Sequence, residues 1–85
     1  MPNRDIKNIP SRHNSVKVIV LRLKELRVAR NMTQQRLAME LSMSQNTVSR
    51  YETGEREPGL AELIRIADYF NVSVDYLLGR TDSPG

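Results

Sequence analysis

A signal for the start of a helix occurs three times in this sequence and constrains its fold more than any other feature. Each time, a Ser or Thr is preceded by one apolar residue and followed, four positions later, by another. The three sets are Met32, Thr33 and Leu37; Met43, Ser44 and Val48; and Val72, Ser73 and Leu77. The hydroxyl can cap the first turn of a helix while the two apolar residues pack across it. The sequence therefore predicts short helices over 34–41 or 34–42, 45–53 and 74–78.

Helical spacing of apolar residues marks two further helices. The first is traced by Ile19, Leu23 and Leu26, with Arg30 continuing the same spacing, and the second by Leu60, Leu63, Ile64, Ala67 and Phe70. We expect them to end near Asn31 and at Asn71, and we expect Gly79 to stop the last helix of the chain. The start of the first helix is open between a short strand and a helix extension, because β-branched residues alternate over 16–20.

Five short helices in 85 residues that contain no Cys indicate a compact all-α domain. Without Cys there is neither a disulfide framework nor a thiolate metal site. The longest apolar run covers only 18–21, far less than the roughly 20 residues that span a bilayer, and no signal-peptide pattern precedes it. We expect a flexible arm over 1–15, one domain over 16–79 and a frayed tail over 80–85, in a protein of the prokaryotic cytoplasm with no membrane partner.

The sequence also argues against an enzyme. A chain this short has no room for a substrate cavity between two lobes. It contains no arrangement of nucleophile, base and orienting acid, no carboxylate pair and no glycine-rich phosphate loop. His13 stands alone in the expected arm, and the methionines Met32, Met39 and Met43 are expected to be core and staple residues. We therefore expect neither catalysis nor a cofactor or metal.

Charge is distributed unevenly along the chain. The net charge is +3, which equals that of residues 1–20 alone, while residues 21–36 carry +4 and residues 52–85 carry −4. A basic leading part suggests a polyanionic partner. We expect the acidic helices from Glu52 onward to face away from it.

The two helices over 34–41 and 45–53 are joined by only about three residues, 42–44. Helices with so short a connection cross steeply, which is the helix-turn-helix geometry. The outward face of the second helix is expected to carry Gln45, Asn46, Ser49 and Arg50. Gln and Asn pair with adenine, Arg with guanine and Ser with either, whereas a merely structural face would more often carry Glu and Lys. This face is therefore predicted to read base edges in double-stranded DNA.

Residues of about 19–79 resemble the lambda-repressor-like DNA-binding domains of the Cro and xenobiotic-response-element group. The matching segments are RLKELR at 22–27, TQQRLA at 33–38, SQNTVSRYETG at 44–54, Pro58, IA at 66–67 and VSVDYLLG at 72–79. The resemblance implies a compact five-helix domain that binds operator DNA, usually as a homodimer on a palindromic site, and usually represses transcription. It therefore implies a sequence-specific transcriptional regulator.

The resemblance also implies roles for single residues. Gln34 matches a position that contacts a backbone phosphate, and Thr33 and Arg36, at the same helix end, are predicted to contact phosphate as well. Thr53 and Arg56 fall in a loop that grips the phosphate backbone in relatives, and Gln45, Asn46 and Arg50 match base-reading positions beside Ser49. Arg27 and Glu52 match a structural pair that links two helices.

The sequence departs from the family's pattern in its turn and in its loop. Ser42 stands where relatives usually have Gly, at a position that needs a left-handed backbone. Glu55 stands where relatives often have Lys, and a carboxylate there would repel a phosphate. In the turn, this departure predicts a strained residue or a slightly different geometry.

A second function class remains open from the sequence alone. The chain is also compatible with an antitoxin-like or adaptor protein whose main partner is another protein. The aromatic cluster Tyr69, Phe70 and Tyr76 near the end of the domain is predicted to complete the core in part and to form a dimer patch in part.

Overall fold

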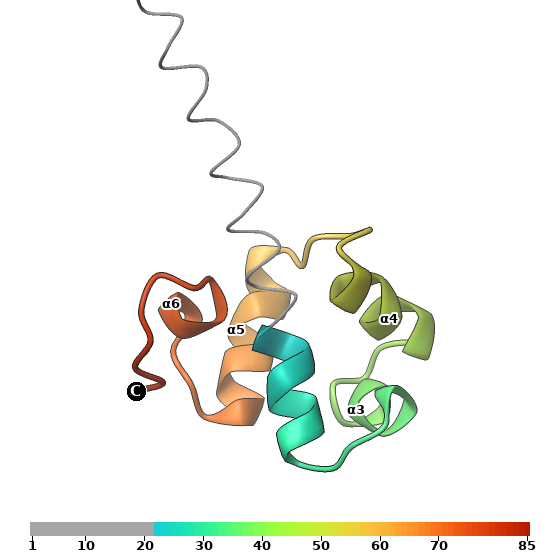
Figure 1. Ribbon diagram of the computed structural model, residues 1–85. Coiled ribbons are helices and arrows are strands. Elements are labelled where there is room, and N and C mark those ends of the chain that lie inside the picture. Colours follow the sequence, from blue (N-terminus) through green and yellow to red (C-terminus); the bar gives the residue numbers. More distant parts are fainter. Residues whose placement is uncertain (1–21) are drawn as a thin grey trace, which may run out of the picture.

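Every helix that the sequence predicts beyond residue 21 is present. The structure, a computed structural model, describes residues 22–85. A helix over 22–29 is followed by α3 (Gln34–Glu40), α4 (Gln45–Thr53), α5 (Leu60–Phe70) and α6 (Val74–Leu77), as Figure 1 shows. These five helices confirm the predicted all-α architecture. The expected arm over 1–15 and the ambiguous stretch over 16–20 lie outside the described residues.

The three predicted capping residues begin three of these helices. The hydroxyl of Thr33 accepts a hydrogen bond from the backbone N–H of Arg36 at 3.0 Å. Ser44 and Ser73 make the same contact with the backbone N–H groups of Thr47 and Tyr76, each at 3.0 Å. Each bond satisfies one of the donors that a helix start leaves without an intrahelical partner. The helix starts were predictable because the capping signal is local.

A residue with a left-handed backbone follows each described helix. These residues are Asn31, Ser42, Gly54, Asn71 and Gly79, with φ angles of 56°, 57°, 86°, 58° and 74°. Gly adopts this conformation freely and Asn tolerates it, whereas Ser at such an angle is strained. Ser42 therefore adopts the left-handed backbone that the sequence predicts for this position, and the turn does not avoid it.

Replacing Ser42 by Gly is expected to stabilise the domain by about 1 kcal/mol, because Gly removes the left-handed strain. Asn71→Gly is the matched control, since Asn71 has a nearly identical φ angle but a side chain that tolerates it. Urea denaturation followed by circular dichroism measures both. A gain for Ser42→Gly no larger than that for Asn71→Gly would show that Ser42 is not strained.

The core is formed by one side of each described helix. Its fully buried members are Leu23, Leu37, Ala38, Leu41, Val48, Tyr51, Ile66, Ala67, Phe70 and Leu77. The three staple residues, Met32, Met43 and Val72, pack against this core from its edge. Burial raises the pKa of the Tyr51 hydroxyl above its ordinary value.

The prediction that Met39 is a core or staple residue is wrong. Met39 is 70% exposed, because it lies on the side of α3 opposite Leu37 and Leu41. In α5, Ala67 and Phe70 of the apolar set that predicted the helix are buried together with Ile66, whereas Leu60 and Ile64 are exposed. Spacing alone does not determine which apolar residues of a short helix meet their neighbours.

The last six residues, for which fraying is predicted, contact the domain in the structure. The backbone N–H of Ser73 donates to the carbonyl of Pro84 at 2.8 Å. The guanidinium of Arg22 lies 4.1 Å from the centre of the Tyr76 ring and 3.1 Å from the carboxylate of Asp82. These contacts bring residues 80–85 against α6 and the helix over 22–29. None of the described helices is long and apolar enough to cross a membrane.

Candidate nucleic-acid interface

The turn between α3 and α4 is held by backbone and side-chain contacts. The N–H of Met43 donates to the carbonyl of Ala38 at 2.9 Å, and the guanidinium of Arg65 donates to the carbonyl of Leu41. Leu37 and Val48 close the core beneath the turn, and α3 and α4 cross there (Figure 1). The sequence analysis missed Arg65, because this residue belongs to α5 and no local pattern links it to Leu41.

The predicted reading face of α4 points away from the core. Val48 and Tyr51 are buried, whereas Gln45, Asn46 and Arg50 are exposed and Ser49 is half-buried. Within residues 22–85, the side chains of Gln45, Asn46, Ser49 and Arg50 make no hydrogen bond or ion pair. The structure thus brings the four predicted base-reading side chains to one face with their donors and acceptors unused.

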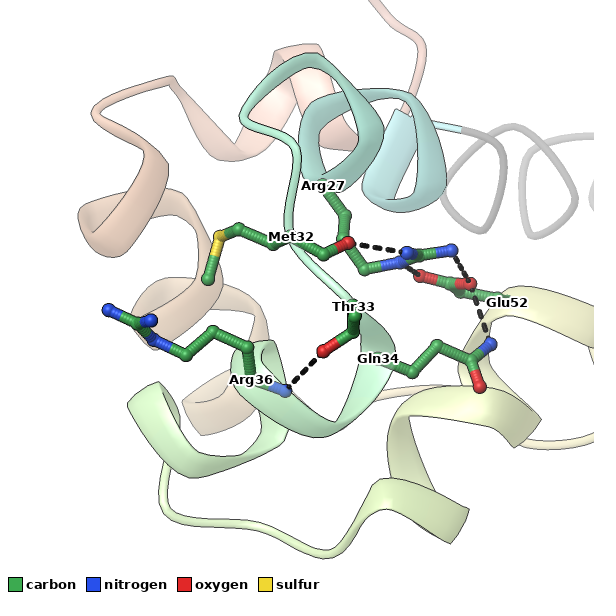
Figure 2. Close-up of polar contacts among 6 residues, drawn as sticks. All are labelled: Arg27, Met32, Thr33, Gln34, Arg36 and Glu52. Atoms are coloured by element: carbon green, nitrogen blue, oxygen red, sulfur yellow. Dashed lines mark hydrogen bonds and ion pairs between the residues drawn. The ribbon is translucent and has the colours of Figure 1, made fainter.

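Arg27, Glu52 and Gln34 form one hydrogen-bonded network, which Figure 2 shows. The guanidinium of Arg27 donates to both carboxylate oxygens of Glu52, at 2.6 Å and 3.0 Å, and to the carbonyl of Met32 at 2.7 Å. The amide of Gln34 donates to the same carboxylate at 3.0 Å. The side chains of Arg27 and Glu52 are only 12% and 4% exposed. This network joins the helix over 22–29 to the start of α3 and the end of α4.

The network changes the expected role of Gln34. From the sequence, this residue was predicted only to contact a phosphate. In the structure one amide N–H of Gln34 is engaged by Glu52, so the half-buried side chain is held beside α4. The amide still has a second N–H to offer to an acceptor outside the domain.

The other arginines of the basic segment 21–36 also have partners inside the domain. Arg22 pairs with Asp82 at 3.1 Å, and Arg36 pairs with Glu40 at 3.0 Å. Arg30 donates to the carbonyls of Tyr69 and Phe70 at 3.5 Å and 3.3 Å. Each arginine of this segment thus has an acceptor within the fold, which the uneven distribution along the sequence did not reveal.

The two remaining predicted residues at the start of α3 are placed differently from Gln34. The hydroxyl of Thr33 accepts the hydrogen bond of the helix cap and keeps its own proton to donate. The Arg36 side chain extends to the side of α3 opposite Gln34 and Glu52 (Figure 2). The structure therefore does not bring Arg36 together with Gln34.

The loop over 53–56 folds around a single atom of α4. The carbonyl oxygen of Arg50 accepts hydrogen bonds from the N–H groups of Gly54, Glu55 and Arg56, at 3.0, 3.0 and 3.3 Å. The hydroxyl of Thr53 lies 3.1 Å from that carbonyl and also 3.1 Å from the Glu55 carboxylate. A hydroxyl has one proton to donate, so the two acceptors compete for it. The predicted phosphate contacts Thr53 and Arg56 are exposed in this loop, and the Glu55 carboxylate lies against Thr53.

The described residues offer little for a metal ion. No group of three or more His, Cys, Asp or Glu side chains in that part of the chain is arranged to hold one.

Comparison with known proteins identifies the same motif. The helix-turn-helix family HTH_3 matches residues 23–77. The chain is 38% identical over 63 residues to the uncharacterized HTH-type transcriptional regulator YobD of Bacillus subtilis (strain 168), which covers 74% of this chain and 56% of YobD.

Two further relatives differ in the direction of regulation that their names state. The chain is 41% identical over 59 residues to the cryptic phage CTXphi transcriptional repressor RstR of Vibrio cholerae, covering 69% of this chain and 53% of RstR. It is 37% identical over 57 residues to the HTH-type transcriptional activator BcrR of Enterococcus faecalis, covering 67% of this chain and 28% of BcrR. The chain thus spans about half the length of YobD and RstR, and less of BcrR. No solved structure matches the sequence.

Proposed function

Because the chain belongs to the helix-turn-helix family HTH_3, we propose that it binds double-stranded DNA in a sequence-specific manner and regulates transcription. The outward face of α4 lies in the major groove and reads base edges there. Exposed amide and guanidinium groups on a helix are the groups that form bidentate contacts with adenine and guanine.

The observation that carries this proposal is the contrast between Arg50 and the arginines that precede it. Each arginine from Arg22 to Arg36 has a partner within the domain. Arg50 is exposed, and its guanidinium makes no hydrogen bond or ion pair with residues 22–85. Arg50, Gln45 and Asn46 therefore suit a ligand that offers both hydrogen-bond donors and hydrogen-bond acceptors, as the edges of DNA bases do.

Phosphate contacts on this side of the domain fix the position of α4 on the duplex. Gln34 lies beside the reading helix, held by Glu52, and its remaining N–H donates to a phosphate oxygen. Thr53 and Arg56 contact the backbone from the loop at the other end of α4. Such contacts set register and affinity, whereas the four side chains of α4 set sequence preference.

We further propose that the protein acts as a homodimeric repressor on a palindromic operator. A two-fold symmetric dimer places two copies of α4 on half-sites of a palindrome, about one helical turn of DNA apart. Repression requires only that the bound domain blocks a promoter. One of the relatives named above, at 41% identity, is itself a transcriptional repressor by name.

Selection of binding sites from random duplex DNA with the purified chain tests the function. The expected result is an enriched palindromic sequence, with half-sites centred about 10 base pairs or a multiple of that apart. A failure to enrich any duplex, together with recovery of a stable protein partner, would instead support the adaptor function.

Replacing Glu55 by Gln is expected to strengthen binding to all duplexes by about threefold. The carboxylate lies next to the proposed phosphate contact Thr53, and two unit charges about 6 Å apart in water repel by about 0.7 kcal/mol. Gln keeps an oxygen for the Thr53 hydroxyl, so that only the charge changes. Fluorescence anisotropy with specific and non-specific duplexes measures the effect.

Glu57→Gln is the matched control for this prediction, because Glu57 is an exposed carboxylate two residues further along the same loop. It should change affinity less than Glu55→Gln does. Equal effects of the two variants would mean that only net charge matters and that the loop around Thr53 is not at the phosphate backbone.

A further inference from the structure

A hollow of about 460 Å³ lies between the connection at 30–33, α3 and the end of α5. Its lining residues are Arg30, Asn31, Met32, Thr33, Arg36 and Tyr69. This volume is within the range of pockets that bind small molecules. Figure 2 shows that Met32 and Arg36 extend to the side of α3 opposite Gln34 and Glu52. The lining of the hollow includes none of the residues that contact DNA in the function proposed above.

Positive charge dominates the lining of the hollow. Two of its six residues are arginines and none is acidic. The guanidinium of Arg36 donates through Nε to Glu40, but this pair is at the surface, with side chains 64% and 37% exposed. Such a surface pair is weak, and the remaining N–H groups of Arg36 make no hydrogen bond with residues 22–85. Arg36 can thus bind an anion, because giving up its pair with Glu40 costs little free energy.

Arg30, which also lines the hollow, is held in place by contacts with the end of α5. Its guanidinium lies 4.9 Å from the centre of the Phe70 ring and 5.5 Å from that of Tyr69. Its two hydrogen bonds to backbone carbonyls are long, at 3.3 Å and 3.5 Å, and they use only part of its five N–H donors. The aromatic rings thus orient a guanidinium that still has donors to offer.

Tyr69 supplies a third donor. Its hydroxyl lies 3.8 Å from the sulfur of Met32 and makes no other hydrogen bond with residues 22–85. A thioether is a weak acceptor, so the hydroxyl gains by donating to an anionic oxygen instead. A phenol with so poor a partner, at the edge of a hollow lined by two guanidinium groups, is suited to an anion.

We propose that this hollow binds the phosphate group of a small ligand, with Arg30, Arg36 and Tyr69 as its donors. The three donors come from three different parts of the fold, which suits a tetrahedral group with oxygens on several sides better than a planar carboxylate. Guanidinium groups match phosphate geometry with paired hydrogen bonds. The volume of the hollow exceeds that of a phosphate and leaves space for the rest of the ligand. This proposal does not depend on DNA binding.

Titration of the full chain with inorganic phosphate at constant ionic strength, followed by NMR of the backbone amides of 30–36 and 69, tests the proposal. Tyr69→Phe should weaken phosphate binding by about tenfold, the worth of one charge-assisted hydrogen bond. The ring and its contact with Phe70 remain, so folding is not at risk. Arg36→Gln should also weaken binding, whereas Glu40→Gln should strengthen it by releasing Arg36 from its carboxylate.

Arg80→Gln is the control, because it removes an exposed arginine that does not line the hollow and should leave phosphate binding unchanged. Equal phosphate affinities of the wild-type, Tyr69→Phe and Arg36→Gln proteins would overturn the proposal, as would an equal loss in Arg80→Gln. A duplex that displaces phosphate from these amides would make the hollow a site for the DNA backbone, and would overturn the assignment to a small ligand. The expected result is that phosphate binds the free and the DNA-bound protein alike.

Discussion

Replacing Glu52 by Ala should lower the free energy of unfolding by about 3 to 5 kcal/mol, as breaking a buried ion pair does. The substitution removes both hydrogen bonds from Arg27 and the one from Gln34. It leaves the guanidinium of Arg27, only 12% exposed, without its carboxylate. A domain of this size has a total stability of only about 5 to 10 kcal/mol, so the variant should be close to unfolding at room temperature. Urea denaturation followed by circular dichroism measures the loss.

Two further variants show whether this loss comes from the uncompensated charge. Glu40→Ala breaks the exposed pair with Arg36 and should cost less than about 1 kcal/mol. The double variant Arg27→Met with Glu52→Leu should be more stable than Glu52→Ala alone, because it leaves no charge without a partner. If Glu52→Ala and Glu40→Ala lose equal stability, the network of Figure 2 does not hold the helices together.

Replacing Arg50 by Ala should weaken binding to the best operator by about 1 to 3 kcal/mol, or roughly five- to 150-fold. The guanidinium of Arg50 has no structural partner within residues 22–85, so the fold should be unaffected. The loss should be confined to operators that carry the preferred base at one position of each half-site. Binding to non-specific DNA should change little. Anisotropy titrations on the selected site and on its single-base variants measure both quantities.

Arg56→Ala is the matched control, because it removes the same charge from the adjoining loop. It should weaken binding to all sequences equally and lower the salt dependence by about one phosphate contact. Arg50→Ala should instead relax the preference at a single base. Identical sequence profiles for the two variants would mean that Arg50 contacts the backbone and that α4 does not read bases in the way proposed.

The parts of the fold that the sequence predicted are those that local interactions determine. Thr33, Ser44 and Ser73 cap their helices because a hydroxyl can reach a backbone N–H three residues away. Gly79 ends the last helix for a similarly local reason. The four side chains proposed to read DNA were identified because the buried residues of α4, such as Val48, determine which side of the helix is exposed.

The features that sequence analysis missed depend on residues far apart in the chain. The contact of Arg65 with Leu41 spans 24 residues, and the contacts of Arg30 with the end of α5 span about 40. No spacing rule predicts such partners, because they depend on how the helices are packed. The partners that the arginines of the basic segment have inside the domain were therefore not predicted.

In the proposed DNA complex, the carbonyl oxygen of Arg50 links the base contact of α4 to the phosphate contacts of the loop over 53–56. Three loop N–H groups converge on this oxygen, so the loop over 53–56 and the end of α4 form one rigid unit. A duplex whose groove width shifts the phosphates at the loop would then also shift the guanidinium of Arg50 relative to its base. The width of a groove depends on base pairs that no side chain touches. The protein should therefore also prefer certain base pairs that none of its side chains contacts. The Arg50 carbonyl oxygen transmits this effect, because it ties the loop to the end of α4.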